Sequence, residues 1–550
     1  NHQQYNIMAS SSGVENYELN QTTQYQNDDL EKKNHVYDDI IEEDDSSYTG
    51  SASKFKYGDE TAELSSSSKF TSKSPFLMKL VKLMDLAETK GIQPVPEEEK
   101  TDSSLYDAGT MWLSANLVVA TFALGTLGGL VFGINFGACV LTIIFFSLLG
   151  CVPVAFFSTF GAHTGMRQMV LSRFLMGNVC ARVFALINCV ACVGWGAVNT
   201  IASAQLLVEV NSPHNCPPWA AVLIICIGTW FITFFGYKVI HFYEKWSWVP
   251  TFAVFLVIIA CLRKKDTFEN GPWGGGPTTA GGVLSFGSTI FGFAIGWVSY
   301  ISDYTAYMPR STNKIALFFS ILCGSMIPLC FVLILGAAAA ATTLVTPQYM
   351  TAYTDRGVGG MLYAIMVEDS LHGFGQFCCV VLAMSTVANN VPNMYSIAFG
   401  AQSIWSPLKK CPRPLWTTVG TGITIAIGIG AYYKFTSFMS NFMDAISYYL
   451  GIYTTMGLSE HFIYNKGRMS SYNPADWDNW HKLPIGIAGC CGLFVGAIGV
   501  AVGMDQTYWV GELGRKIGEY GGDIGFELGV GFSFIVFNLL RPFEKKYFGR

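Results

Sequence analysis

Runs of about twenty apolar residues recur along this chain from about residue 110 to its end. A helix of that length crosses the ~30 Å hydrocarbon layer of a membrane. Because lipid offers no hydrogen bonds, such runs must be helices whose backbone groups are paired internally. The sequence therefore predicts an all-α polytopic membrane protein with about twelve transmembrane helices, at residues 110–135, 138–160, 179–208, 218–236, 241–262, 283–308, 315–343, 373–404, 415–433, 436–464, 484–505 and 524–541.

The composition supports the same class. Of 550 residues, 51% are hydrophobic and only 13% are charged, whereas soluble domains carry about 25% charge. The sequence holds no GxxxxGK[ST] phosphate-binding loop, so no ATP-driven pump is indicated. Most of the 15 cysteines lie within apolar runs and lack metal-ligand spacing, which is typical of packing residues. We therefore expect a membrane transporter without a metal or cofactor site, and neither an enzyme nor a nucleic-acid-binding protein.

Residues 1–105 differ from the rest of the chain, because they are polar and rich in Ser, Asp, Glu, Asn and Lys. Such a segment buries too little apolar surface to offset its ordering entropy. We predict a disordered cytosolic N-terminal tail there. Its acidic and serine-rich runs are candidate sites for a kinase or a ubiquitin ligase, and simple solubility explains them equally well.

An even number of spans places both termini on one side of the membrane, and positive charge indicates which side. The loops at 134–138 and 209–217 hold no Lys or Arg. The opposite loops are basic, although Arg263, Lys264 and Lys265 break the pattern on one outer loop. We predict a plasma-membrane protein with both termini in the cytosol, where the basic residues are Arg167, Arg173, Lys238, Lys245, Arg310, Lys314, Lys409, Lys410, Arg413, Lys466 and Arg468.

Glycine clusters mark the first and sixth spans. Glycine within a helix costs about 1 kcal/mol relative to alanine, and transporters use interrupted helices at the bilayer midplane to expose backbone groups to a solute. Close packing explains any single glycine, but the two clusters lie five spans apart, the offset of an inverted five-plus-five repeat. We predict helix breaks at these clusters, which comprise Gly125, Gly128, Gly129 and Gly133 in the first span and Gly287, Gly292 and Gly296, followed by Pro309, in the sixth.

Aromatic and amide side chains stand out in the third, sixth and eighth spans. An indole and a carboxamide lie four residues apart in the third span and therefore share one helix face, which a serine continues. The eighth span holds three amides within five residues, beside a proline, and amides at membrane depth are costly unless partnered. The residues are Trp195, Asn199 and Ser203, then Phe293 and Trp297, then Asn389, Asn390, Pro392 and Asn393.

These residue types suit a flat, uncharged heteroaromatic solute. Indole faces stack on a planar ring, and carboxamides both donate and accept hydrogen bonds. A sugar phosphate or an amino-acid zwitterion would require fixed charge, which these positions do not carry. The alternative interpretation is that the amides hold helices together.

Several long stretches resemble the fungal purine–cytosine permeases of the nucleobase–cation symporter family one. The resemblance runs from about Glu88 to Arg550. It implies a LeuT-like core of two inverted five-helix repeats at 106–465, two additional C-terminal helices at 466–541 and a short cytosolic tail at 542–550. The stretches include SANLVVATFALGTLGGLVFGINFG, CVGWGAVNTIASAQLL, SFGSTIFGFAIGWVSYISDYTAYMP and STVANNVPNMYS.

The resemblance also implies a function, namely import of adenine, guanine, hypoxanthine and cytosine with protons by alternating access, together with entry of 5-fluorocytosine. In the family, two tryptophans sandwich the base between the first, third, sixth and eighth helices. The matching positions are Ser114, Trp195, Asn199, Trp297, Asn389, Asn390, Pro392 and Asn393. A relative carrying allantoin, uracil, nucleosides or pyridoxine, and a receptor that kept the fold, are the alternatives.

The sequence leaves two candidates for the coupling ion, namely sodium and the proton. Sodium-driven relatives hold a cation between first-helix carbonyls and eighth-helix hydroxyls, where Ser385 and Thr386 match, whereas fungal members resemble proton symporters. A proton carrier needs a titratable group, and acids within the membrane are functional candidates. The candidates are Asp303, Asp444, Glu460 and Glu209.

Overall fold

The computed structural model describes residues 91–211, 216–234, 237–264 and 268–550. The predicted N-terminal tail, with its candidate modification sites, lies outside the described residues as far as residue 90. Within the described part the chain is overwhelmingly helical. A short antiparallel hairpin of β1 (Asp505–Gln506) and β2 (Trp509–Val510) links the last two long helices.

A helix covers each of the twelve predicted spans. In chain order they are α4 (Leu105–Asn116) with α5 (Val119–Leu130), α6 (Phe136–Thr164), α8 (Asn178–Val210), α9 (Pro218–Phe234), α10 (Tyr237–Lys264), α11 (Gly276–Ile295) with η4 (Gly296–Ser299) and α12 (Ile301–Thr305), α13 (Lys314–Thr342), α15 (His372–Ile404), α16 (Arg413–Ala431), α17 (Phe435–Ser459), α18 (Ile487–Gly503) and α19 (Gly525–Phe548).

The lengths and composition of these helices confirm a polytopic membrane protein. Within the described residues, eight helical runs are long and apolar enough to cross a membrane, and the bent pair α4–α5 makes a ninth. One of the eight runs, Arg413–Tyr464, contains both α16 and α17. The remaining predicted spans, α9 and α18, are apolar helices of 17 residues each.

The two sets of five spans repeat one order. Each set opens with a broken span, continues with a 29-residue helix (α6 or α13), and reaches a 33-residue helix (α8 or α15). Short helices precede each 33-residue helix: α7 (Gln168–Met176) in the first set, and α14 (Pro347–Tyr363) with η5 (Ala364–Leu371) in the second. The short helices were not predicted, because they are too brief to be read as spans.

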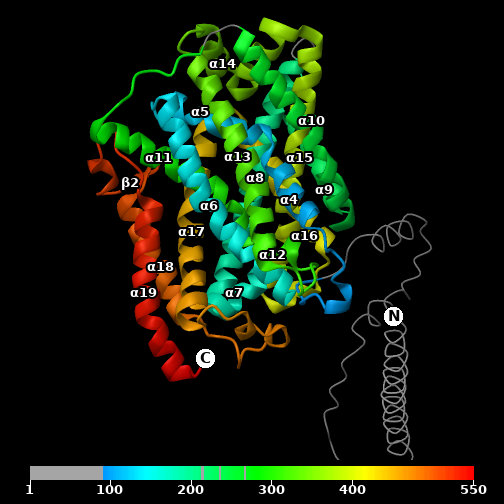
Figure 1. Cartoon of the computed structure of the whole chain (residues 1–550), viewed down its shortest axis with the longest axis vertical. Coiled ribbons are helices and arrows are strands. Elements are labelled where there is room, and N and C mark those ends of the chain that lie inside the picture. The colour runs from blue at the N-terminus through cyan, green and yellow to red at the C-terminus, as the bar shows by residue number, and fades with distance from the viewer. Residues whose placement is uncertain (1–90, 212–215, 235–236, 265–267) are drawn as a thin grey trace, which may run out of the picture. The chain divides into compact units, whose positions relative to one another are not determined.

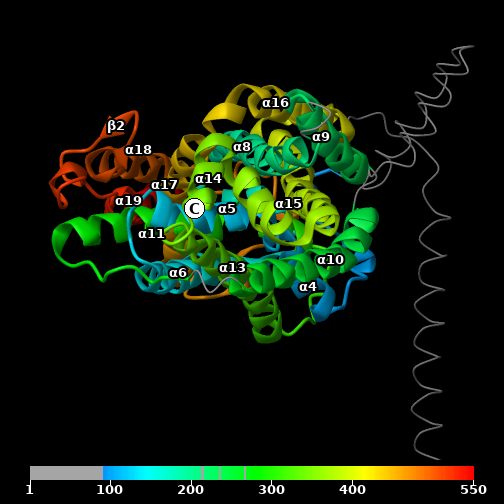
Figure 2. The ribbon, with the colours of Figure 1, turned by 90° about the horizontal axis from the view of Figure 1, so that it is seen from above.

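The long helices pack as one bundle, with α15 against α8 and α13 against both α5 and α6 (Figure 1). The pair α18–α19 packs against α17 at one edge of the bundle, away from α9 and α16, as the view from above also shows (Figure 2). Large apolar side chains such as Leu141, Phe145 and Ile227 are more than half exposed on the outer helices. Those surfaces suit contact with lipid tails.

The first and sixth spans are both interrupted. In the first, α4 and α5 meet at 55° across Leu117 and Val118. In the sixth, a 3-10 segment separates α11 from α12, and Gly296 is its first residue. Both breaks fall at the same place in the two repeats, in the opening span of each.

The predicted position of the first break is wrong, because Gly125, Gly128 and Gly129 lie within the regular helix α5. Two of them serve close packing instead. A Cβ atom at Gly125 would lie 2.1 Å from the carbonyl oxygen of Leu333 in α13, and one at Gly128 would lie 2.5 Å from a cysteine Sγ. Gly292 likewise sits inside α11, where a Cβ would lie 2.0 Å from a carbonyl oxygen of α17.

Residues 91–104, which the sequence analysis assigned to the tail, pack against the ends of membrane helices. The Lys100 ammonium donates to the carbonyl of Ala162 at 3.1 Å and pairs with Glu97 at 2.8 Å. The main-chain amide of Arg310 also donates to Glu97, at 2.8 Å. The hydrogen bond from Lys100, followed by the one from Arg310, lowers the pKa of Glu97 below its usual value. The packed part of the chain therefore begins before residue 105.

A buried ion pair joins α19 to the end of α17. Arg541 donates two hydrogen bonds, of 2.8 and 2.9 Å, to the carboxylate of Glu460 in η8 (Glu460–Tyr464). Both side chains are only 3% exposed. The pair joins the end of α17 to α19 and supplies the Glu460 carboxylate with a permanent cation.

Candidate substrate-binding site

Two indole rings face each other where the sixth span is broken. Trp195 of α8 and Trp297 of η4 have ring centroids 6.4 Å apart and planes inclined by only 14°. Trp297 is oriented by Asn116, whose side-chain oxygen accepts from the indole Nε1 at 3.2 Å. Gly296 makes room for this arrangement, since a Cβ atom there would lie 2.5 Å from the Trp195 ring.

Carboxamides form a hydrogen-bonded network that joins four helices. Asn199 of α8 donates to the side-chain oxygen of Asn389 at 2.7 Å, and Asn389 donates in turn to the carbonyl of Ala115, at the end of α4. Asn393 donates to the carbonyl of Asn389 at 2.8 Å and accepts from the hydroxyl of Tyr300 at 2.6 Å. The network ties α8 and α15 to both broken spans.

Two buried polar atoms at this site stay unpaired. The Nε1 donor of Trp195 and the side-chain oxygen of Asn199 have no hydrogen-bond partner among the described residues. A buried donor or acceptor left unpaired costs about 1–3 kcal/mol. A heterocycle that donates a hydrogen bond can satisfy the Asn199 oxygen, whereas the Trp195 N–H lies in the plane of its ring and is directed away from anything stacked on the ring face.

The present ring separation is slightly too small for a base. Carbon atoms in contact lie about 3.5–4.0 Å apart, so a flat ring between two parallel rings needs roughly 7 Å. The centroids of Trp195 and Trp297 are 6.4 Å apart. Admitting a base therefore requires the two indoles to separate by about 0.6 Å or more, a shift within the reach of side-chain and helix adjustment.

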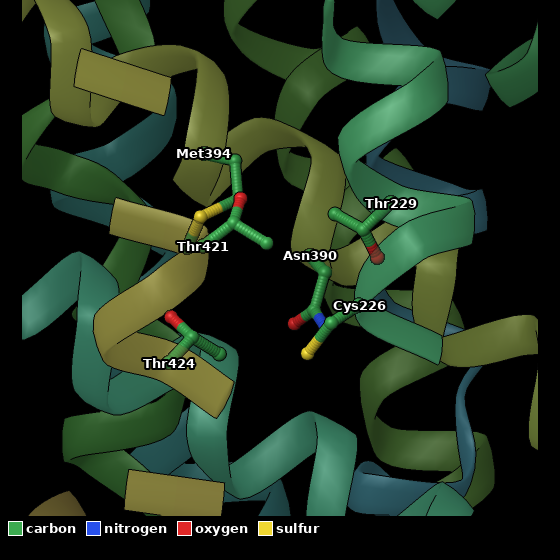
Figure 3. Close-up of a pocket in the computed structure, with 6 residues that line it drawn as sticks. All are labelled: Cys226, Thr229, Asn390, Met394, Thr421 and Thr424. Carbon is green, nitrogen blue, oxygen red and sulfur yellow. The ribbon is translucent and has the colours of Figure 1, made fainter. Parts of the chain in front are cut away.

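Asn390 points away from the indoles. Its amide donates to the hydroxyl of Thr200 at 3.0 Å, and its side-chain oxygen faces a small pocket between α9, α15 and α16 (Figure 3). Side chains from those three helices line the pocket, namely Cys226, Thr229, Asn390, Met394, Thr421 and Thr424. Asn390 therefore lies on a different face of α15 from Asn389 and Asn393.

Ser114 and Pro392 make contacts at the margin of the network. The Ser114 hydroxyl donates to the main-chain carbonyl of Glu244 in α10, with which α4 is in contact. The carbonyl of Pro392 accepts from the hydroxyl of Tyr304 at 3.0 Å. Both residues connect the helices around the indoles, and neither side chain is hydrogen-bonded to the amides in the part of the chain that the structure describes.

The other predicted acids have partners. Asp303 accepts from the main-chain amide of Gln168 at 2.9 Å. Asp444 accepts from a threonine hydroxyl and from the amide of Gln506, each at 2.9 Å. Glu209 is paired with Arg356 at 2.8 Å. Each of these carboxylates is part of the contacts between helices.

The hydroxyls predicted for a cation site are engaged in protein contacts. Ser385 donates to the carbonyl of Leu382 at 2.5 Å and accepts from the amide of Val119 at 3.4 Å, across the break of the first span. The Thr386 hydroxyl is hydrogen-bonded to Ser203. The structure therefore places Ser385 beside the break, and the hydroxyls of both residues take part in hydrogen bonds within the protein.

Three contact residues escaped the sequence analysis. Asn116 would have followed from the rule applied to the other amides, since it is a carboxamide at membrane depth beside Ser114. Tyr300 carried no signal, because tyrosine is common in apolar runs. Glu244 precedes Lys245 near the predicted edge of a span, where a charged pair indicates an interface with water.

Comparison with known proteins identifies the family. Residues 94–511 match the family model described as a permease for cytosine/purines, uracil, thiamine and allantoin. The purine-cytosine permease FCY2 of Saccharomyces cerevisiae is 61% identical over 466 residues, which cover 84% of this chain and 87% of that protein. The purine-cytosine permease fcyB of Emericella nidulans is 45% identical, over 84% of this chain and 90% of that protein.

The fold is shared with a solved transporter. The nucleobase-cation-symport-1 family transporter Mhp1, in a closed conformation with bromovinylhydantoin bound, has a TM-score of 0.64 at 14% identity, covering 84% of this chain and 96% of that one. These findings confirm both the resemblance and the predicted transporter fold. The chain is a membrane transporter and belongs to the family of permeases for cytosine/purines, uracil, thiamine and allantoin.

Proposed function

We propose that this protein imports purine bases and cytosine together with protons across the plasma membrane. The observation that carries the proposal is the nearly parallel pair Trp195 and Trp297 beside the network of Asn199, Asn389 and Asn393. Indole faces bind a planar ring by stacking. Amides, unlike carboxylates, match the mixed donor and acceptor edge of an uncharged base.

Proton coupling and a cytosolic position of both termini belong to the same proposal. Sodium at the eighth helix would have to share the Ser385 and Thr386 oxygens with hydrogen bonds that both hydroxyls already make within the protein. An amide N–H directed at Ser385 is also unfavourable next to a cation. The basic loops support the orientation through the positive-inside rule.

Uptake of labelled cytosine and hypoxanthine into yeast cells without their own transporters tests the function. We expect saturable uptake in which cytosine, adenine and hypoxanthine compete with one another and uracil does not. Efficient competition by uracil or pyridoxine would contradict the proposed substrates and favour a related heterocycle. A protonophore is expected to abolish accumulation, and replacing sodium by choline is expected to leave it unchanged.

Gly296→Ala is expected to weaken cytosine binding about tenfold, because an added methyl group in a packed site costs ~1–3 kcal/mol. The new Cβ would lie 2.5 Å from the Trp195 ring and displace it. The matched control is Gly422→Ala in α16, where the added Cβ meets nothing within 4 Å. The measurement is the KM of cytosine uptake, with protein at the cell surface quantified to compare maximal rates. Equal KM values for both variants would refute the role of Gly296.

A further inference from the structure

Glu244 is a buried acid without a hydrogen-bond partner among the described residues. Its side chain in α10 is 0% exposed, and neither carboxylate oxygen has a hydrogen-bond partner among the described residues. Its neighbour Lys245 does not compensate it, because the Lys245 ammonium pairs with Asp107 of α4 at 2.9 Å. An ionised carboxylate in such a place is strongly destabilising. The arrangement seen here is compatible only with the neutral, protonated carboxyl group.

This situation separates Glu244 from the other buried acids. Glu460 is held by Arg541 and Glu209 by Arg356. Asp303 and Asp444 accept hydrogen bonds from protein donors. Partners of this kind favour the ionised form of an acid, and Glu244 has none of them among the described residues. Glu244 has to exchange a proton whenever its surroundings change between dry and hydrated.

Three consecutive residues at the end of α4 connect Glu244 with the candidate substrate site. The Ser114 hydroxyl donates to the main-chain carbonyl of Glu244, while the carbonyl of Ala115 accepts from Asn389. The side-chain oxygen of Asn116 accepts from Trp297 at 3.2 Å. The contact between α10 and α4 is therefore linked to the positions of Trp297 and Asn389, because the three connecting residues span less than one helical turn.

We propose that Glu244 binds the coupled proton, and that this protonation permits α10 to close on α4 around the occupied substrate site. This inference rests on the proposed proton-coupled import. The step is a plain proton transfer: the carboxylate takes a proton from water when its site is hydrated, closes as the neutral acid, and returns the proton to water when the α4–α10 contact opens. The ionised form cannot be buried again, so closure requires a proton.

The neighbouring elements offer few charges that would compete for this role. Within the described residues, α9 has no Asp, Glu, Lys or Arg, α15 has none either, and the only one in α13 is Lys314 at its start. By sequence, the titratable and charged groups on α10 and on the elements in contact with it are Tyr237, Lys238, His241, Tyr243, Lys245, Arg263 and Lys264 of α10, Tyr106 and Asp107 of α4, Glu368 and Asp369 of η5, Lys314 of α13, and His372 and Tyr395 of α15; Tyr304 of α12 also lies near Glu244.

The test compares Glu244→Gln with Glu209→Gln, a matched change at an acid that has a cation partner. Glutamine imitates the protonated acid permanently, so Glu244→Gln is expected to retain exchange of labelled for unlabelled cytosine. Its accumulation should fall from the roughly tenfold ratio that one proton moving down one pH unit supports to a ratio near one. Cytosine-induced proton uptake should vanish, and Glu209→Gln should keep both.

Several outcomes would overturn this assignment. Accumulation and proton uptake at wild-type levels in Glu244→Gln would refute it while leaving the proposed function intact, whereas a wild type without proton uptake would refute the function itself. If the glutamine variant does not reach the cell surface, Glu244→Asp takes its place. That variant keeps a carboxyl group in altered surroundings, so coupling should persist with a shifted pH profile, and an unchanged profile would count against Glu244.

Discussion

Asn389→Ala is expected to reduce cytosine uptake by about 100-fold or more, since each buried group left unpaired costs ~1–3 kcal/mol and 1.4 kcal/mol is tenfold. Asn389 accepts from Asn199 and donates to the carbonyl of Ala115. Its loss leaves both groups without their partner and frees the end of α4. The measurement is kcat/KM for uptake, normalised to surface protein.

The control for Asn389 is Asn441→Ala, which removes an amide that bonds the hydroxyl of Thr507 at 2.8 Å in an exposed place. That variant should transport cytosine as the wild type does. If Asn389→Ala keeps uptake within about threefold of the wild type, a loss of under 1 kcal/mol, the network is not part of the binding site. Retention of Asn389→Ala in the endoplasmic reticulum would indicate that the amides serve folding.

Arg541→Met is expected to destabilise the protein by about 3–5 kcal/mol, because removing one partner of a buried ion pair leaves an uncompensated charge. The charges left behind are the carboxylate of Glu460, which is 3% exposed, and that of Glu544, which lies 3.9 Å from Arg541 and is 4% exposed. Thermal unfolding of the detergent-solubilised protein, followed by size-exclusion chromatography, measures the effect. The folded fraction should fall at temperatures where the wild type is intact.

Two further variants separate the buried charge from simple loss of a contact. The double variant Arg541→Met with Glu460→Met removes the bidentate pair and leaves Glu544 held by the main-chain amides of Gly486 and Ala488, so it should recover most of the stability that the single variant loses. Lys482→Met breaks an exposed pair with Asp476 and should cost about 0–1 kcal/mol. A double variant as unstable as the single one would refute the argument.

The sequence could predict those parts of the candidate site in which helix periodicity alone brings the residues together. Trp195 and Asn199 lie four residues apart within the continuous helix α8, and Asn389 and Asn393 likewise within α15. Side chains so spaced share a face whatever surrounds them. The sequence could therefore indicate that these residues act together before any contact between helices was known.

The break of the first span could not be placed in this way. Low helix propensity pointed to Gly125, but α4 ends earlier, where Thr121 bonds the carbonyl of Asn116 and Ser385 accepts from the amide of Val119. Partners from distant helices stabilise the break, and they are invisible to a local pattern. Glycine lowers helix propensity, but it also permits two helix backbones to come into contact. At Gly125 the glycine serves this close contact and does not break the helix.

The contact of Gly125 with the main chain of Leu333 has a mechanical consequence. Gly336 repeats it three residues later in α13, where a Cβ would lie 2.2 Å from the carbonyl oxygen of Phe122. Because the two backbones are in direct contact, with no side chains between them, α5 and α13 move together as one rigid body. A movement that separates the two indoles must then shift α8 or the broken sixth span relative to that body.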